Sequence, residues 1–303
     1  MNTINLKIQA VRCQNNPILY PDMAGLKGEV GSNINGPSLI RVPDWIENPL
    51  GNYYLYFAHH QGKYIRLAYS NNIQDSWTVY QSGTLKLNQT VCQNHIASPD
   101  VHVDDKTREI RMYFHGVHPS HGQVTFLATS KDGLNFTPSS SVLGPFYFRV
   151  FKYGGWYYAI AKNKNIGGVL LRSKDGITAF ERGPEFIPNL RHTAVLLKGD
   201  NLMVFYSRIG DAPESILMSY VDLKQDWKSW APSPPIPVLE PEEDYEGISF
   251  AIEPSQKGAA KGKVRQLRDP AIYQEDNKHY ILYSIAGESG IAIAELKSIV
   301  VSN

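Results

Sequence analysis

Ionisable side chains recur where short apolar strands are expected to begin. Asp100 stands in Ser98-Pro99-Asp100-Val101, and Asp269 stands in Arg268-Asp269-Pro270. Imidazole and guanidinium groups occupy related positions, namely His95, Arg149, Arg191 and His192. An imidazole titrates close to neutral pH, and an arginine binds oxyanions through two parallel donors. These residue types predict a site that moves protons and binds a polar or anionic ligand.

A second set of polar residues lies where the following strands are expected to end. It comprises His59, His60, His115, Lys162, Arg208 with Asp211, and Glu288. Average strands are poor in charge, so the two sets together are more informative than any single member. Each residue also has a structural interpretation: Asp269 precedes a proline and could cap a turn, Arg208 could pair only with Asp211, and Glu246 could be a solvated member of an acidic loop.

A repeated element must position these side chains. Five times, a Pro-containing or polar entry leads into a short apolar strand, a turn and a second strand rich in aromatic residues. The entries begin at Gly36, Ser98, Gly144, Arg191 and Asp269, and the second strands cover 53–58, 111–115, 156–161, 202–207 and 280–284. Repeats of short strands that cannot bury their faces alone are typical of a β-propeller. The sequence therefore predicts an all-β fold, a five-bladed β-propeller with a central polar funnel.

The five blades are expected at 35–85, 95–143, 144–188, 190–240 and 266–297. Blade 5 has only three strands before the chain ends, whereas Leu6 to Cys13 alternates apolar and polar residues as a half-buried strand does. We expect this segment to complete blade 5 and so to remove an exposed edge. No linker separates the repeats, and residues 1–303 are interpreted as a single domain. The long segment 240–266, which contains Glu246, is placed to fold over the funnel.

Composition argues against two classes of partner. The formal net charge is +1, whereas a binder of duplex nucleic acid normally carries a concentrated basic excess. No stretch approaches the ~20 apolar residues of a membrane span. The first residues lack the basic-then-apolar pattern of a secretion signal. We expect no nucleic-acid or membrane partner, and a cytoplasmic location, or a periplasmic or secreted one if a signal has been removed. No oligomeric state is predicted.

Several motifs carry a family resemblance that covers nearly the whole chain. They are Asn16 to Leu19, the Pro37-Ser38-Leu39-Ile40 strand, the Ser-x-Asp-Gly turns at 130–133 and 173–176, and the final Arg268-Asp269-Pro270-Ala271-Ile272-Tyr273 with its partner strand. The sequence resembles the five-bladed propeller glycoside hydrolases, of which families 43, 117 and 130 are the nearest groups. The resemblance implies the fold directly and implies carbohydrate degradation as the function.

The resemblance also implies a mechanism. Those enzymes cleave a glycosidic bond of an oligosaccharide or glycoside, mostly with inversion, using one group to activate water and another to protonate the leaving oxygen. An arabinanase-type member places its base Asp before the proline of the first blade, where this chain has Gly36. The carboxylate candidates are then Asp100 and Asp269, and the acid candidates are Glu246 and the histidines His95 and His192.

The full prediction is a glycosidase acting on a small or terminal sugar unit, which can be neutral or anionic. Its catalytic candidates are Asp100, Asp269, Glu246 and His192. Its substrate-binding candidates are His59, His95, His115, Tyr147, Arg149, Arg191, Arg208 and Arg268. Family 130 chemistry, phosphorolysis, would instead use Arg149, Lys162, Arg191 and Arg208 for phosphate.

Two further interpretations remain open. Gly36 favours a carbohydrate-binding propeller without catalysis, and the histidine-rich rim favours a His-dependent polysaccharide lyase or a metal enzyme. No His-x-His or His-Glu-x-x-His spacing is present. We therefore predict no cofactor and no metal ligands, while a structural or channel metal ion is compatible with the pattern.

Overall fold

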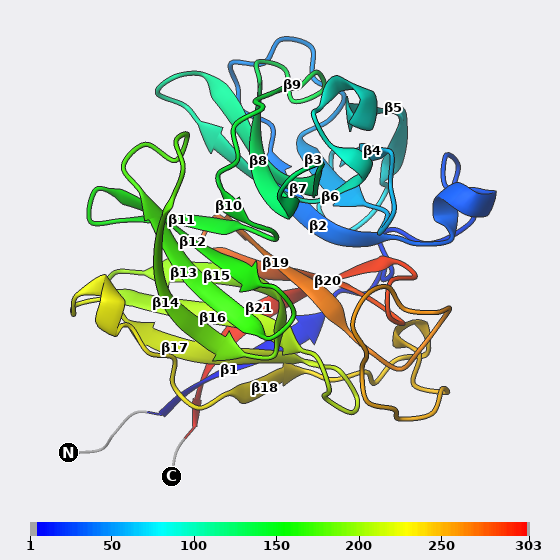
Figure 1. Cartoon of the computed structure of the whole chain (residues 1–303). Helices are drawn as coiled ribbons and strands as arrows, with labels where there is room; N and C mark the ends of the chain where they lie inside the picture. The colour runs from blue at the N-terminus through cyan, green and yellow to red at the C-terminus, as the bar shows by residue number, and fades with distance from the viewer. Residues whose placement is uncertain (1–4, 302–303) are drawn as a thin grey trace.

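The computed structural model describes residues 5–301 and forms a five-bladed β-propeller (Figure 1). Five antiparallel sheets are arranged in a ring, and the first strand of each blade is its innermost. Among the described residues, helical structure is limited to short 3-10 turns, η1 (Gly28–Gly31), η2 (Leu87–Gln89), η3 (Trp227–Ser229) and η4 (Asp244–Glu246). The predicted fold class is confirmed.

The strands follow the predicted repeat blade by blade. Blade 1 contains β2 (Asn35–Arg41), β3 (Tyr53–Ala58), β4 (Tyr64–Ser70) and β5 (Thr78–Lys86). Blade 2 contains β6 (Gln93–Asp104), β7 (Glu109–His118), β8 (Gly122–Ser130), β9 (Thr137–Pro138) and β10 (Gly144–Pro145). Blade 3 contains β11 (Arg149–Tyr153), β12 (Trp156–Asn163), β13 (Gly167–Ser173) and β14 (Glu181–Pro188). Blade 4 contains β15 (Leu190–Lys198), β16 (Asn201–Arg208), β17 (Ile216–Asp222) and β18 (Ile236–Leu239).

Blade 5 is built from both ends of the chain. Its strands β19 (Arg268–Glu275), β20 (Lys278–Ser284) and β21 (Ile291–Val301) are followed by β1 (Asn5–Arg12), which pairs antiparallel with β21 (Figure 1). This pairing satisfies the edge of β21 and closes the ring. The predicted closing strand is therefore confirmed, one residue earlier at each end than the sequence indicated.

Hydrophobic clusters fill the spaces between neighbouring blades. The aromatic residues that close the Ser-x-Asp-Gly and related turns, Trp77, Phe136 and Phe180, belong to three different clusters of this kind. Tyrosine hydroxyls add polar links between blades: Tyr56 donates to the Gly133 carbonyl at 2.8 Å and Tyr113 donates to the Gly176 carbonyl at 2.9 Å. These links fix the angle between adjacent blades and hence the positions of the innermost strands.

One predicted boundary is wrong. Gly144 and Pro145 form β10, which pairs with β8 of blade 2, so blade 3 begins at β11 and not at residue 144. Strand pairing determines this boundary. The outer edge of β8 is still unpaired at Val124 and Thr125 when the chain leaves β9, and β10 pairs with it there. No helix among residues 5–301 is long and apolar enough to span a membrane.

Candidate active site at the centre of the propeller

A break in strand register recurs at the same level of the innermost strands. The ladder skips two residues between Asn35 and Ser38, and β6, β15 and β19 skip at 97–100, 190–193 and 268–271. Residues 36, 98 and 269 within these breaks have positive φ, as does Tyr147 just before β11. A bulge re-aims the side chains it contains. The breaks thus bring side chains from several blades toward one point, which we call the upper mouth of the channel.

Asp269 and His192 form the central pair of the upper mouth. Asp269 Oδ1 lies 2.9 Å from His192 Nδ1, and Asp269 Oδ2 accepts a hydrogen bond from the Ser284 hydroxyl at 3.0 Å. Burial raises the pKa of Asp269, but His192, Ser284 and Arg268 outweigh it and hold that pKa far below its usual range. Burial lowers the pKa of His192 to about 4. At neutral pH the pair is therefore a carboxylate beside a neutral imidazole, and a proton on Nδ1, the nitrogen that faces Asp269, leaves the Nε2 lone pair free.

Aromatic rings connect this pair to the outer surface. The Tyr147 ring lies 4.8 Å from the His192 ring and 4.5 Å from the His115 ring, and His115 lies 5.6 Å from His95. Burial raises the pKa of Tyr147 and lowers that of His115, so both are neutral near pH 7. His115 Nδ1 is buried without a hydrogen-bond partner among the described residues. The structure brings together five predicted site residues in this row.

Two buried arginines support the upper mouth. Glu214 has one oxygen 2.7 Å from Arg191 Nε and the other 3.1 Å from Arg268 Nε. Arg268 also contacts Glu288 at 3.0 Å. Both guanidinium groups donate to the Gly258 carbonyl, and Arg191 also donates to the Gln256 carbonyl. The loop that was expected over the funnel is thus attached to the two arginines, which have carboxylate and carbonyl partners before any ligand binds.

Lys162, at the end of β12, extends into the same region. Its side chain is only 3% exposed, and its Nζ lies 5.4 Å from the centre of the Tyr147 ring and 5.7 Å from that of Phe146. Burial lowers the pKa of Lys162 to about 7, with Glu214 and Asp269 opposing the effect and Arg191 and Arg268 adding to it. Lys162 therefore exchanges its proton close to neutral pH.

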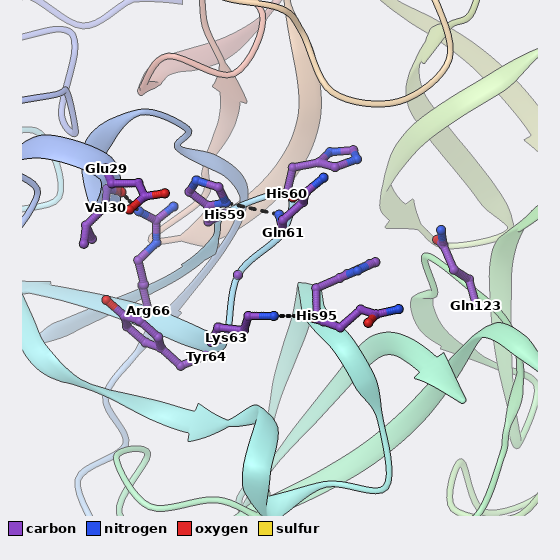
Figure 2. Close-up of a pocket in the computed structure, with 12 residues that line it drawn as sticks. Glu29, Val30, His59, His60, Gln61, Lys63, Tyr64, Arg66, His95 and Gln123 are labelled. Carbon is purple, nitrogen blue, oxygen red and sulfur yellow. Dashed lines mark hydrogen bonds between the residues drawn. The ribbon is translucent and has the colours of Figure 1, made fainter. Parts of the chain in front are cut away.

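A cleft of about 880 Å³ opens beside this centre between blades 1 and 2 (Figure 2). Figure 2 shows His60, His95 and Gln123 directed from three segments toward the same open space, with His59 to the left of His60. His60 Nδ1 lies 3.5 Å from Glu288, while the His95 ring contacts His115. The cleft has the volume for a sugar-sized ligand, and its His95 is linked to His192 by the row of rings through His115 and Tyr147.

Asp100 and Arg149 lie instead at the lower mouth, a separate cavity of about 270 Å³ lined by the later residues of the innermost strands. Asp100 Oδ2 lies 2.9 Å from His102 Nε2 and accepts a hydrogen bond from the Val150 N–H at 2.8 Å. Burial raises the pKa of Asp100, but His102, Arg149 and the Val150 N–H lower it below its usual value. Arg149 donates to the Phe148 carbonyl at 3.0 Å.

Two other candidates lie apart from both mouths. Glu246 is fully buried and accepts hydrogen bonds from Arg12 and from the Tyr283 hydroxyl at 2.8 Å, which fastens β1 to η4. Arg208 pairs with Asp211 at 3.0 Å on the partly exposed end of β16. Arg208 therefore has the Asp211 partner that the sequence allowed for it, whereas Glu246 is a buried partner of Arg12 and not a solvated member of an acidic loop.

Sequence reasoning missed Glu214 and the partners of Glu288. Glu288 Oε2 accepts hydrogen bonds from Asn33 at 2.5 Å and from Asn35 at 3.2 Å. Despite its burial, contact with His60 and the charge of Arg268 lower the pKa of Glu288 to about 2. Burial raises the pKa of Glu214, although the positive charges of Arg268 and Arg191 act to lower it. Glu214 follows no repeated motif, so no sequence signal distinguishes it from a surface carboxylate.

Residues 5–301 contain no cluster of three or more His, Cys, Asp or Glu side chains arranged to hold a metal ion. The imidazoles of the upper mouth lie against aromatic rings, and the carboxylates lie against cations or amides.

Similar solved structures support the fold. A glycosyl hydrolase from Bacteroides ovatus superposes with a TM-score of 0.69 at 10% identity, covering 95% of this chain and 94% of the other. A thermostable family 43 glycoside hydrolase gives 0.65 at 12% identity, covering 95% and 93%. A family 43 β-xylosidase/α-arabinofuranosidase from a compost metagenome, crystallised with xylotriose, gives 0.61 at 14% identity, covering 89% and 94%. These likenesses confirm the predicted resemblance as a glycoside hydrolase-like fold.

No protein-family model matches the sequence. An uncharacterized protein of Acanthamoeba polyphaga mimivirus is 35% identical over 323 aligned positions, covering 94% of this chain and 90% of the viral protein. Identity at this level along almost the whole of both chains requires a shared fold and a shared origin. The chain therefore belongs to the same family as this mimivirus protein, built on the five-bladed propeller of the glycoside hydrolases.

Proposed function

We propose that this protein is a glycosidase that hydrolyses the bond to a small or terminal sugar unit at the upper mouth. One observation carries the proposal: the Asp269 carboxylate, buried and ionised, lies 2.9 Å from a neutral His192, which a row of rings links to His95 in a cleft of sugar size. The propeller fold is shared with glycoside hydrolases, one of which was crystallised with xylotriose. These likenesses support an oligosaccharide ligand.

The pair is suited to activate water. His192 Nε2 takes a proton from the attacking water, while the Asp269 charge stabilises the imidazolium that forms. The water oxygen bonds to the anomeric carbon as the glycosidic C–O bond breaks. Tyr147, kept protonated by burial, gives its proton to the leaving oxygen and recovers one from His192, whose ring is 4.8 Å away. One water is added in total.

Product mass tests the reaction. The protein is incubated with neutral, uronate-containing and sulfated oligosaccharides, and Asp269→Asn serves as the matched inactive variant. Products that sum to substrate plus one water, formed by the wild type and not by the variant, support hydrolysis. A folded wild type that binds an oligosaccharide without cleaving any would replace this proposal with a binding propeller.

Elimination is the second candidate, and the adjacency of Tyr147, His192 and Lys162 favours it. With a uronate, His192 would take the C5 proton, the C4–O bond would break and Tyr147 would protonate the leaving oxygen. A cation near the carboxylate would stabilise the charge that develops at C5. Products that sum to the intact substrate, one of them unsaturated, would establish this reaction in place of hydrolysis.

A further inference from the structure

The cations around the two mouths differ in whether they already have partners. Arg191 and Arg268 share Glu214, and Arg268 also contacts Glu288. Arg149 donates to two backbone carbonyls, and Arg208 pairs with Asp211. Within the described part of the chain, Lys162 Nζ takes part in no hydrogen bond and no ion pair, although the residue is only 3% exposed.

A buried amine without a partner is costly. The ammonium form loses its hydration on burial, and this loss is recovered only when an anion or several acceptors replace the water. The faces of Tyr147 and Phe146 supply a modest attraction to the cation but no hydrogen-bond acceptor. Among the described residues, the amine therefore has aromatic neighbours but no anionic partner.

We propose that Lys162 receives the carboxylate of a sugar acid, which makes uronic acids the substrate class of the upper mouth. The inference rests on the proposed function only in placing a sugar there, and it holds equally for hydrolysis or elimination. Tyr147 and Phe146 border the amine with aromatic faces, which suit the apolar face of a pyranose ring. A ligand carboxylate that accepts a hydrogen bond from Lys162 would hold the pyranose ring beside His192.

Charge balance favours a single negative charge over phosphate. Asp269, Glu214 and Glu288 supply three carboxylates near the centre, whereas Arg191 and Arg268 supply two guanidinium groups. One protonated lysine neutralises the remaining negative charge, and the carboxylate of the ligand then adds a single negative charge. A phosphate dianion would leave two uncompensated negative charges in this buried region, where a carboxylate leaves one, and would therefore be less favourable.

Binding of the carboxylate must be coupled to proton uptake. The charged and titratable groups that face Lys162 are Arg191, Glu214, Asp269, Arg268, His115, His192 and Tyr147. Of these, the histidines and Tyr147 are neutral near pH 7, and they do not change charge between pH 7 and 9. The pKa of Lys162 is about 7 in the unliganded protein. Above that pH, the protein must therefore take up one proton when it binds a ligand that needs the ammonium form.

Isothermal titration calorimetry on the full chain tests the proposal. The probes are the methyl glycosides of glucuronate, galacturonate and mannuronate, each paired with its neutral parent sugar, and inorganic phosphate, all at millimolar concentration. At least one uronide is expected to bind at least tenfold more tightly than its neutral parent. Its affinity is expected to fall about tenfold per pH unit between pH 8 and 9, with about one proton taken up per ligand.

Two variants assign the effect to this residue. Lys162→Met, which keeps the length of the side chain and removes the charge, is expected to weaken uronide binding by about 30-fold or more and to abolish proton uptake. Lys198→Met, at an exposed position at the far end of β15, removes one positive charge from the surface and is expected to change neither. A thermal melt of Lys162→Met at or above the wild-type temperature shows that the lysine serves a ligand and not the fold.

Four results would overturn the proposal: equal binding of uronides and neutral sugars, binding of no uronide, phosphate competing in place of uronides, or a Lys162→Met protein that melts far below the wild type. The assay measures binding, so it is separate from the proposed reaction. A protein that binds uronides through Lys162 but cleaves none would remove the proposed function and leave this inference in place.

Discussion

The two mouths of the channel each contain an aspartate 2.9 Å from a histidine, yet their surroundings differ. At the upper mouth both partners of the Asp269–His192 pair are buried, and a tyrosine, a lysine and two further histidines lie beside them. At the lower mouth the His102 side chain is 39% exposed, and Asp100 also accepts the Val150 N–H of the next blade. The lower pair therefore connects blade 2 to blade 3, whereas the upper pair has an imidazole nitrogen left for a ligand.

The comparison shows that the environment of an Asp–His pair, and not its distance, decides what the pair can do. Burial keeps His192 neutral, with a pKa of about 4, and its Nε2 available as a base. The backbone N–H that Asp100 accepts gives that carboxylate a structural role. The following predictions test this difference, from the largest expected effect to the smallest.

The first prediction compares His192→Gln with His102→Gln. Glutamine keeps a polar group in each place but cannot accept a proton near neutral pH. Loss of the base at the upper mouth should lower kcat/KM by about 10²- to 10⁴-fold, whereas the lower variant should stay within a few-fold of wild type. Rates on the first cleaved oligosaccharide from the product-mass assay measure both. A greater loss in His102→Gln would reverse the assignment of the two mouths.

The second prediction concerns Glu214, the shared partner of Arg191 and Arg268. Glu214→Gln leaves two buried guanidinium groups without their carboxylate and should lower the free energy of unfolding by about 3–5 kcal/mol. Glu181→Gln is the matched control, because Glu181 pairs with Arg172 at 2.8 Å on the surface and should cost at most about 1 kcal/mol. Urea unfolding measures the stability of both variants. Equal losses would show that burial does not determine how much these ion pairs contribute to the free energy of unfolding.

The third prediction follows from the lowered pKa of Lys162. Between its folded pKa of about 7 and an unfolded pKa of about 10.4, the unfolded chain carries a proton that the folded chain lacks. The stability of the wild type relative to Lys162→Met should therefore rise with pH in this window, by at most about 1.4 kcal/mol per pH unit. Unfolding of both proteins in urea at pH 7, 8 and 9 measures the rise, and a difference that is flat with pH would contradict it.

The smallest effect is expected at the rim. Arg208 and Asp211 form a partly exposed pair, so Arg208→Gln should change the free energy of unfolding by about 0–1 kcal/mol and leave activity unaltered. Thermal unfolding together with the activity assay measures the change. A large loss of activity would extend the upper mouth to this rim and would weaken the contrast between buried and exposed residues on which the comparison depends.

The repeat pattern predicts most of the fold because it depends on local chemistry. Alternation of apolar residues defines the strands, Asp-Gly defines the turns, and the closing aromatics fill the spaces between blades. The closing strand β1 is predicted for the same reason, since its alternation and the missing edge of blade 5 are both visible in the sequence. The start of blade 3 is not predicted correctly, because the pairing of β10 with β8 depends on the free edge of β8, which only the folded structure shows.

For the site, the sequence by itself identified the residue types at strand entries, including Asp269, His192, Tyr147, His115 and His95. Only the tertiary structure separated Asp100 from Asp269, tied Glu246 to Arg12 and left Lys162 without a partner. The physical reason is that partners come from segments far apart in the chain, 20 residues for Arg268 with Glu288 and 255 residues for Asn33 with Glu288. Separation along the sequence does not predict such contacts, because the arrangement of the blades in a ring determines which residues meet.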